Sequence, residues 1–80
     1  METDVPNKLK NYLRLGYPVE VVPAEEGGCL VRYPDLPGCL AQVEAGDDPS
    51  RVASEILEGW LAVPIADGEP IPLPATAVFR

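Results

Sequence analysis

The chain contains no histidine among its 80 residues and only two cysteines. Without histidine it lacks the most common general base and the most common metal ligand, and Ser–His or Cys–His catalytic pairs are excluded. Two thiols cannot hold zinc without other ligands. The sequence also lacks an apolar run long enough to span a bilayer and any signal-peptide pattern. We therefore expect a soluble, cytoplasmic protein with no membrane partner.

Basic residues are also scarce, since six Lys and Arg stand against 13 Asp and Glu and give a net charge of −7. The charge is unevenly distributed: residues 1–16 carry a net charge of +1, whereas residues 17–79 carry a net charge of −9. A body this acidic repels nucleic-acid backbones and is steered toward a basic partner. The other explanation is that acidity only keeps a small protein soluble. Charge alone leaves both explanations open.

The short length predicts one domain over residues 1–80, with no internal repeat. A domain of this size buries only a little over ~60% of the surface that its unfolded chain exposes, so it is marginally stable alone. Such domains often depend on oligomerisation, disulfides or a metal. A homodimer or higher homo-oligomer is therefore the expected state.

Alternating apolar and polar residues predict three short strands separated by turns rich in glycine and proline. If Tyr33 opposes Cys39 across the turn of residues 34–38, the alternating apolar side chains share one face of an antiparallel meander. This register places Cys29 on the order of 13 Å from Cys39, beyond the roughly 7 Å Cα separation of a disulfide. We therefore expect free thiols. The strands are expected over residues 17–22, 29–33 and 39–44.

Apolar residues at helical spacing predict two helices, one over residues 5–15 and one that begins after Asp48. Asp48 is a good N-cap, and Pro49 suits the first turn because its missing amide hydrogen would be unpaired there. Pro64 should kink or end this helix near Ala62. The apolar stripe of the second helix should cover the apolar face of the sheet. The stripe consists of Val52, Ala53, Ile56, Leu57, Trp60 and Leu61.

These elements predict an α+β fold, in which an N-terminal helix precedes a three-stranded antiparallel β-meander with one helix packed on it. A possible short C-terminal strand covers residues 76–79, after a proline-rich segment at 70–74 that should run extended along the surface. Trp60 is expected in the core; the alternative is that it anchors a dimer or partner interface. Gly59 destabilises the helix by about 1 kcal/mol relative to alanine, and either admits a close neighbour or is merely tolerated.

Four acidic residues are the candidates for a magnesium site in a metal-dependent nuclease. We expect no such site, because Asp35 is a turn former, Asp48 is a helix cap and the other two are solvated. The sequence therefore predicts no enzyme, no catalytic residues, no metal and no cofactor. The four candidates are Asp35, Glu44, Asp47 and Asp48.

Five short segments carry a family resemblance. They are Tyr17-Pro18-Val19, Glu25-Glu26-Gly27-Gly28, Tyr33-Pro34-Asp35-Leu36-Pro37-Gly38-Cys39, Trp60-Leu61 and Asp67-Gly68-Glu69-Pro70-Ile71-Pro72. In order and spacing, the chain resembles the HicB-like antitoxin family over residues 17–74. The resemblance implies a partial RNase H-like fold, with a helix packed on an antiparallel sheet. The resemblance does not imply nuclease activity, because a shared fold does not by itself supply an active site.

The resemblance also implies a function, namely that of an antitoxin in a type II toxin–antitoxin system. Such a protein binds and occludes a HicA-like toxin, a small basic ribonuclease that cleaves messenger RNA. Complementary charge favours that pairing. Many family members carry a C-terminal DNA-binding module, for which this sequence has no room. We therefore expect no DNA-binding domain and no direct DNA binding.

The partner surface is expected at the acidic edge of the sheet, the turn around Asp35 and the second helix. The alternative hypothesis is a stand-alone oligomeric protein-interaction domain of unknown partner, with no antitoxin role. Binding and neutralisation of a toxic neighbour would distinguish the two. The expected contact residues are Asp35, Leu36, Glu44, Asp47, Glu55 and Glu58.

Overall fold

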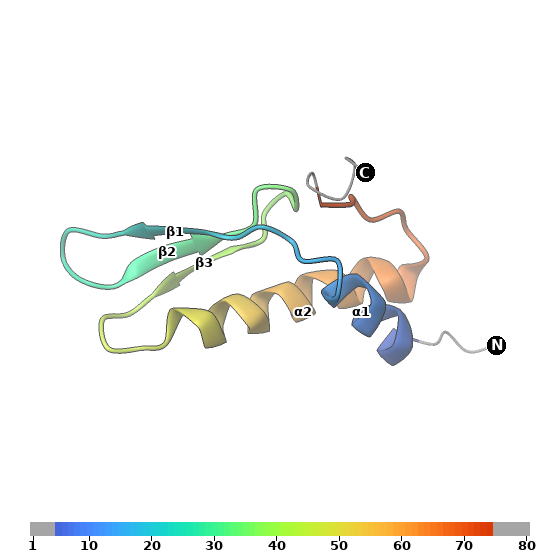
Figure 1. The fold of residues 1–80 in the computed structure, drawn as a ribbon, viewed down its shortest axis with the longest axis horizontal. Helices are drawn as coiled ribbons and strands as arrows, with labels where there is room; N and C mark the ends of the chain where they lie inside the picture. The colour runs from blue at the N-terminus through green and yellow to red at the C-terminus, as the bar shows by residue number, and fades with distance from the viewer. Residues whose placement is uncertain (1–4, 75–80) are drawn as a thin grey trace.

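The computed structural model of the protein describes residues 5–74. The elements follow in the order α1 (Val5–Leu13), β1 (Glu20–Pro23), β2 (Cys29–Arg32), β3 (Leu40–Val43) and α2 (Pro49–Asp67). The three strands form one layer, α2 lies along one face of it, and α1 packs against α2 (Figure 1). This arrangement confirms the predicted α+β fold. The predicted strand at 76–79 lies outside the described residues.

The sheet is an antiparallel meander in which β2 lies between β1 and β3. Val31 opposes Val21 on one side and Ala41 on the other. The Tyr33 amide donates to the Cys39 carbonyl at 2.9 Å, which closes the turn between β2 and β3. The predicted register of these two strands is therefore confirmed.

β1 is shorter and more exposed than the sequence indicates. The strand begins at Glu20, and Tyr17 instead lies before it, with its hydroxyl donating to the Pro72 carbonyl at 2.7 Å. Tyr17 is buried as expected, but Val19 and Val21 are 42% and 53% exposed. Alternation in the sequence allowed Val19 and Val21 to join the covered apolar face, but α2 packs chiefly on β2 and β3 and leaves the face of β1 open.

The hydrophobic core lies between the sheet and α2. The turn of residues 34–38 contributes Leu36, whose side chain is 1% exposed, and α2 contributes Leu61, which is fully covered. The predicted stripe of α2 therefore does cover the apolar face of the sheet. The buried residues are Tyr17, Cys29, Val31, Tyr33, Leu36, Cys39, Val43, Ala53, Leu57, Leu61 and Ile65.

The start of α2 is as predicted, but its end is not. The Asp48 side chain accepts a hydrogen bond from the Ser50 amide at 3.0 Å, which confirms the N-cap. The helix then continues past Pro64 to Asp67. The Pro64 carbonyl accepts from the Glu69 amide at 2.8 Å, in the turn that closes the helix. Gly68, with φ +71°, supplies the left-handed residue that ends the helix.

The N-terminal helix is confirmed with a slightly earlier end. α1 stops at Leu13, and the chain then makes a turn in which the Leu15 amide donates to the Tyr12 carbonyl at 3.0 Å. Gly16 follows with φ +75°, so it occupies a conformation that favours glycine. In the sequence, Asp4 stands where it could cap this helix, but it lies outside the described residues.

Both cysteines are free and buried, as the register predicted. Burial also raises the pKa of the Cys39 thiol above its ordinary 9.0, which lowers its thiolate fraction at neutral pH. We expect the folded protein to react slowly with a thiol reagent and to gain two labels once denatured without reductant. Mass spectrometry checks this. Denatured protein that takes no label until it is reduced would contradict the register.

Candidate protein-interaction surface

One side of α2 carries apolar side chains that the core covers only in part. These residues are spaced four, four and three positions apart, so they share one side of the helix. The first three pack against the core and stay partly exposed, whereas Val63 is 62% exposed. We call this set the α2 flank. It consists of Val52, Ile56, Trp60 and Val63.

The turn of residues 34–38 fixes the position of the α2 flank. The Trp60 indole Nε1 donates to the Pro37 carbonyl at 2.9 Å, and the Cys39 thiol donates to the Ile56 carbonyl at 3.6 Å. Trp60 therefore packs against the core while part of its ring remains in solvent. The expected core position of Trp60 therefore applies only in part.

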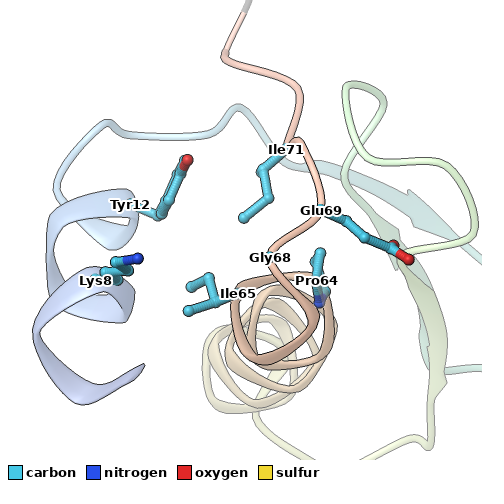
Figure 2. Close-up of a pocket in the computed structure, with 7 residues that line it drawn as sticks. All are labelled: Lys8, Tyr12, Pro64, Ile65, Gly68, Glu69 and Ile71. Atoms are coloured by element: carbon cyan, nitrogen blue, oxygen red, sulfur yellow. The ribbon is translucent and has the colours of Figure 1, made fainter. Parts of the chain in front are cut away.

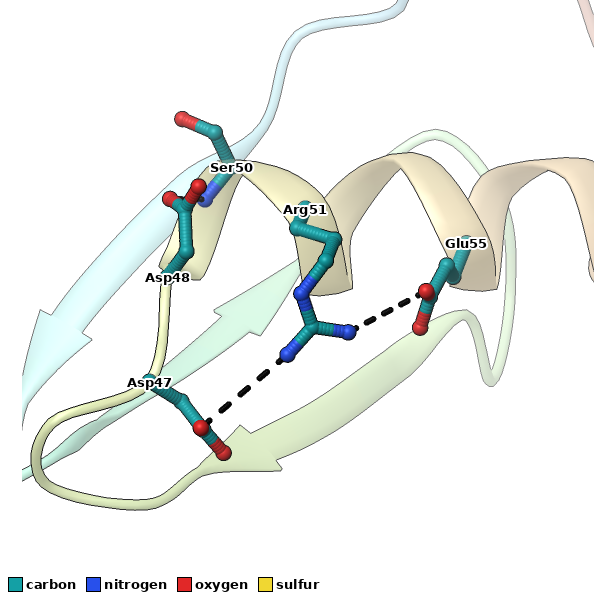
Figure 3. A network of polar contacts seen from close by, with 5 residues as sticks. All are labelled: Asp47, Asp48, Ser50, Arg51 and Glu55. Atoms are coloured by element: carbon teal, nitrogen blue, oxygen red, sulfur yellow. Dashed lines mark hydrogen bonds and ion pairs between the residues drawn. The ribbon is translucent and has the colours of Figure 1, made fainter.

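Acidic residues lie next to the α2 flank. Arg51 bridges Asp47 at 4.0 Å and Glu55 at 3.1 Å along the first turns of α2 (Figure 3). These pairs are about half exposed, so they contribute little to stability. Glu58 is exposed one turn further on and forms no ion pair with any residue of the described range 5–74. Glu55 lies three positions from Val52 and so borders the α2 flank, whereas Glu58 lies on the other side of the exposed surface of α2.

The predicted contact residues fall into three places. Glu55 and Glu58 lie on α2, whereas Glu44 and Asp47 lie in the exposed loop before it. Asp35 lies in the turn that holds Trp60. Leu36 does not belong to the surface, because its side chain fills the core.

The sequence did not point to Val63 as a surface residue. Val63 follows Trp60 by three positions, and residues three positions apart lie on the same side of a helix. This spacing was overlooked because Pro64 was expected to end α2 before this residue. Trp60 and Val63 are exposed apolar side chains on this surface, Trp60 in part and Val63 largely.

A small pocket lies between α1 and the C-terminal end of α2 (Figure 2). Its volume is about 150 Å³, below the roughly 300–1,000 Å³ typical of ligand sites. Lys8 and Glu69 are the charged residues of its lining and lie on opposite sides of it (Figure 2). They form no convergent reactive set. The lining residues are Lys8, Tyr12, Pro64, Ile65, Gly68, Glu69 and Ile71.

Across residues 5–74, no three Cys, Asp or Glu side chains gather closely enough to hold a metal ion. Asp48 instead caps α2, and Asp47 pairs with Arg51. In the same range, neither helix has the length and hydropathy needed to cross a membrane.

Gly59 lies exposed on α2, between Ile56 and Val63 in sequence. A Cβ atom built there would meet nothing within 4 Å, so no neighbour within the described chain requires glycine. We expect Gly59→Ala to raise the free energy of unfolding by about 1 kcal/mol. Gly68→Ala should lower it, because Gly68 has φ +71°. Urea denaturation of both variants checks this, and a destabilised Gly59→Ala would contradict the described environment.

The sequence of the chain is similar to those of curated proteins. No family model matches the chain. The chain is 38% identical over 58 residues to Antitoxin HicB 1 of Photorhabdus laumondii subsp. laumondii, which covers 72% of this chain and 37% of that protein. It is 37% identical over 59 residues to Antitoxin HicB of Escherichia coli (strain K12), covering 74% and 43% respectively. Most of this chain is therefore HicB-like.

The HicB-like chain spans about two fifths of the length of the curated relatives that it matches. The same similarity holds for Antitoxin HicB of Escherichia coli O157:H7. The resemblance stated from five short segments is thus confirmed at the level of the family. The match covers less than half of each relative, so it does not extend the activity or partners of the complete relatives to this chain.

Proposed function

We propose that this HicB-like chain is an antitoxin of a type II, HicAB-like toxin–antitoxin system. It binds and occludes a small basic toxin that cleaves messenger RNA, and it acts in the cytoplasm without catalysis of its own. The observation that carries the proposal is a partly exposed apolar flank on a helix whose exposed surface is acidic, in a chain similar to HicB antitoxins.

The α2 flank has the composition of an interface centre with a charged rim. Trp60 is held in place by its hydrogen bond to Pro37, so little side-chain freedom is lost when a partner covers it. Val63 adds an exposed apolar contact beside it. Tryptophan is enriched among residues that dominate binding energy, and such residues are commonly surrounded by a rim that excludes water.

The acidic residues explain why the partner would be basic. Glu58 lacks a cationic neighbour within the described residues, and Asp47 and Glu55 share the single guanidinium of Arg51. Complementary potentials raise the rate of encounter with a cationic surface. A ribonuclease needs such a surface to hold the RNA backbone, so an acidic protein seated on it would block the substrate.

Co-expression tests this proposal. The chain is produced together with the small basic protein encoded beside it, and growth and co-purification are measured. We expect restored growth, a complex, and slower association at higher salt, because salt screens surface charges. A neighbour that is not toxic, or a toxic neighbour that the chain does not bind, would contradict the proposal. A homo-oligomer without either effect would support the alternative, an interaction domain with no antitoxin role.

A further inference from the structure

A pocket of about 370 Å³ lies at the C-terminal end of α2 and shares two residues with the α2 flank. The remaining lining residues come from the last turn of the helix and from the segment that follows it. The volume lies at the lower end of the range typical of ligand sites, so it suits one side chain better than an extended ligand. The lining residues are Trp60, Val63, Pro64, Glu69 and Pro70.

Trp60 gives this pocket an aromatic wall in a fixed position. The only polar atom of its side chain, the indole Nε1, already donates to the Pro37 carbonyl at 2.9 Å. The ring is therefore held in place, and it offers the pocket its carbon skeleton and its π electrons. Such a ring attracts cations to its face, and it suits arginine in particular, because a planar guanidinium can stack on it.

Glu69 gives the pocket a carboxylate that forms no ion pair within residues 5–74. The backbone amide of Glu69 donates to the Pro64 carbonyl at 2.8 Å, which fixes the base of the side chain beside the end of the helix. The side chain itself is exposed and points away from Lys8, the cation of the neighbouring small pocket (Figure 2). The carboxylate is therefore open to a cation from outside the chain.

The end of α2 adds to the attraction for a cation. The C-terminus of a helix carries a partial negative charge, and basic residues are favoured in its last turn. The last turn of α2, which the structure describes in full, has no basic residue and ends at Asp67. An anionic group would be repelled here, and an apolar group would cover the Glu69 carboxylate without pairing it.

We propose that this pocket binds the guanidinium group of one arginine of the basic partner. The group stacks on the Trp60 indole and donates hydrogen bonds to the Glu69 carboxylate. Arginine fits better than lysine, because a planar guanidinium can stack and donate two parallel hydrogen bonds, whereas an ammonium is a strongly hydrated point charge. The single carboxylate is then engaged, so the pocket binds one arginine. The source of that arginine rests on the proposed function, whereas the preference of the pocket for a guanidinium does not.

Short peptides with blocked ends test this preference without the toxin. Trp60 is the only tryptophan of the chain, so its indole N–H signal in an NMR spectrum reports on this site. The peptide Gly-Arg-Gly at millimolar concentration should shift the signal, and Gly-Lys-Gly should shift it less. A peptide with neutral citrulline in place of arginine should leave it unchanged. Equal shifts with the arginine and citrulline peptides would overturn the proposal.

Two matched variants test the part of the carboxylate. Glu69→Gln removes the charge from the pocket and should weaken binding of the arginine peptide at least about threefold. Glu26→Gln removes the same charge from the hairpin between β1 and β2, at the opposite end of the molecule from the end of α2 (Figure 1), and should leave peptide binding unchanged. Both side chains are exposed, so both variants should keep the fold, which circular dichroism checks. Equal binding by the two variants would overturn the proposal.

The same two variants separate the pocket from the proposed function. In a calorimetric titration with the toxin, Glu69→Gln should have an affinity at least about fivefold lower than that of Glu26→Gln. Equal affinities would overturn the assignment of the partner's arginine to this pocket, while the proposed function would stand. A wild-type chain that binds the arginine peptide but not the toxin would contradict the proposed function and still support the preference of the pocket for a guanidinium.

Discussion

Replacing Leu61 with alanine is expected to lower the free energy of unfolding by about 2–5 kcal/mol. The Leu61 side chain is completely buried where α2 meets the sheet. Its removal leaves a cavity that the surrounding core residues can fill only in part. Domains of this kind are stable by only about 5–15 kcal/mol, so the variant would lose a large fraction of its stability.

The matched control is Val63→Ala, two positions further along the same helix. Val63 is 62% exposed, so its truncation should change the free energy of unfolding by less than about 0.5 kcal/mol. Urea denaturation followed by circular dichroism measures both variants. Similar losses in the two would show that α2 does not cover the sheet through the Leu61 side of the helix.

Replacing Val63 with arginine should weaken toxin binding by at least about thirtyfold, which corresponds to roughly 2 kcal/mol. Arginine would place a positive charge beside Trp60, at the centre of the surface that we assign to a basic partner. Like charges opposed across an interface disfavour the complex, and the added guanidinium would be buried without a counterion. The fold should be unaffected, because Val63 is largely exposed.

Leu40→Arg is the control for overall charge. Leu40 is 53% exposed and opposes Arg32, on the face of the sheet that α2 does not cover. It should reduce toxin affinity only slightly. Calorimetric titration of the toxin with each variant decides between the two surfaces. Equal weakening would mean that net charge, and not the α2 flank, governs binding.

The pairing of β2 with β3 could be predicted because its determinants are local. A turn fixed by two prolines joins two alternating runs, and one residue of slip would turn the apolar side chains to solvent. The start of α2 was equally clear, since Asp48 and Pro49 together form a recognised N-terminal signal.

The exposure of the β1 side chains could not be predicted from the alternation of apolar and polar residues. Val21 shares its face with the buried Val31, yet it is exposed because α2 does not extend over this edge. The reach of a helix over a sheet depends on packing between distant elements, and residue spacing carries no information on it. The end of α2 differs for another reason: proline usually ends a helix, but here the helix continues past Pro64 to the left-handed cap at Gly68.

The candidate surface was predicted only in outline. The acidic contribution of Glu55 and Glu58 follows from their place off the apolar stripe of α2. Leu36 was misplaced because a leucine within a polar turn can face either solvent or the core, and here the turn folds over the core. The role of Trp60 required the hydrogen bond to Pro37, which joins residues 23 positions apart in the sequence.

The most direct test of the account is an inhibition titration. Purified chain is added to the small basic toxin encoded beside it, and cleavage of a messenger RNA is followed. The account predicts that cleavage falls in proportion to the chain added and stops near equimolar amounts, and that Val63→Arg shifts this endpoint to a large excess. Cleavage that continues unchanged in the presence of excess wild-type chain would contradict the antitoxin function.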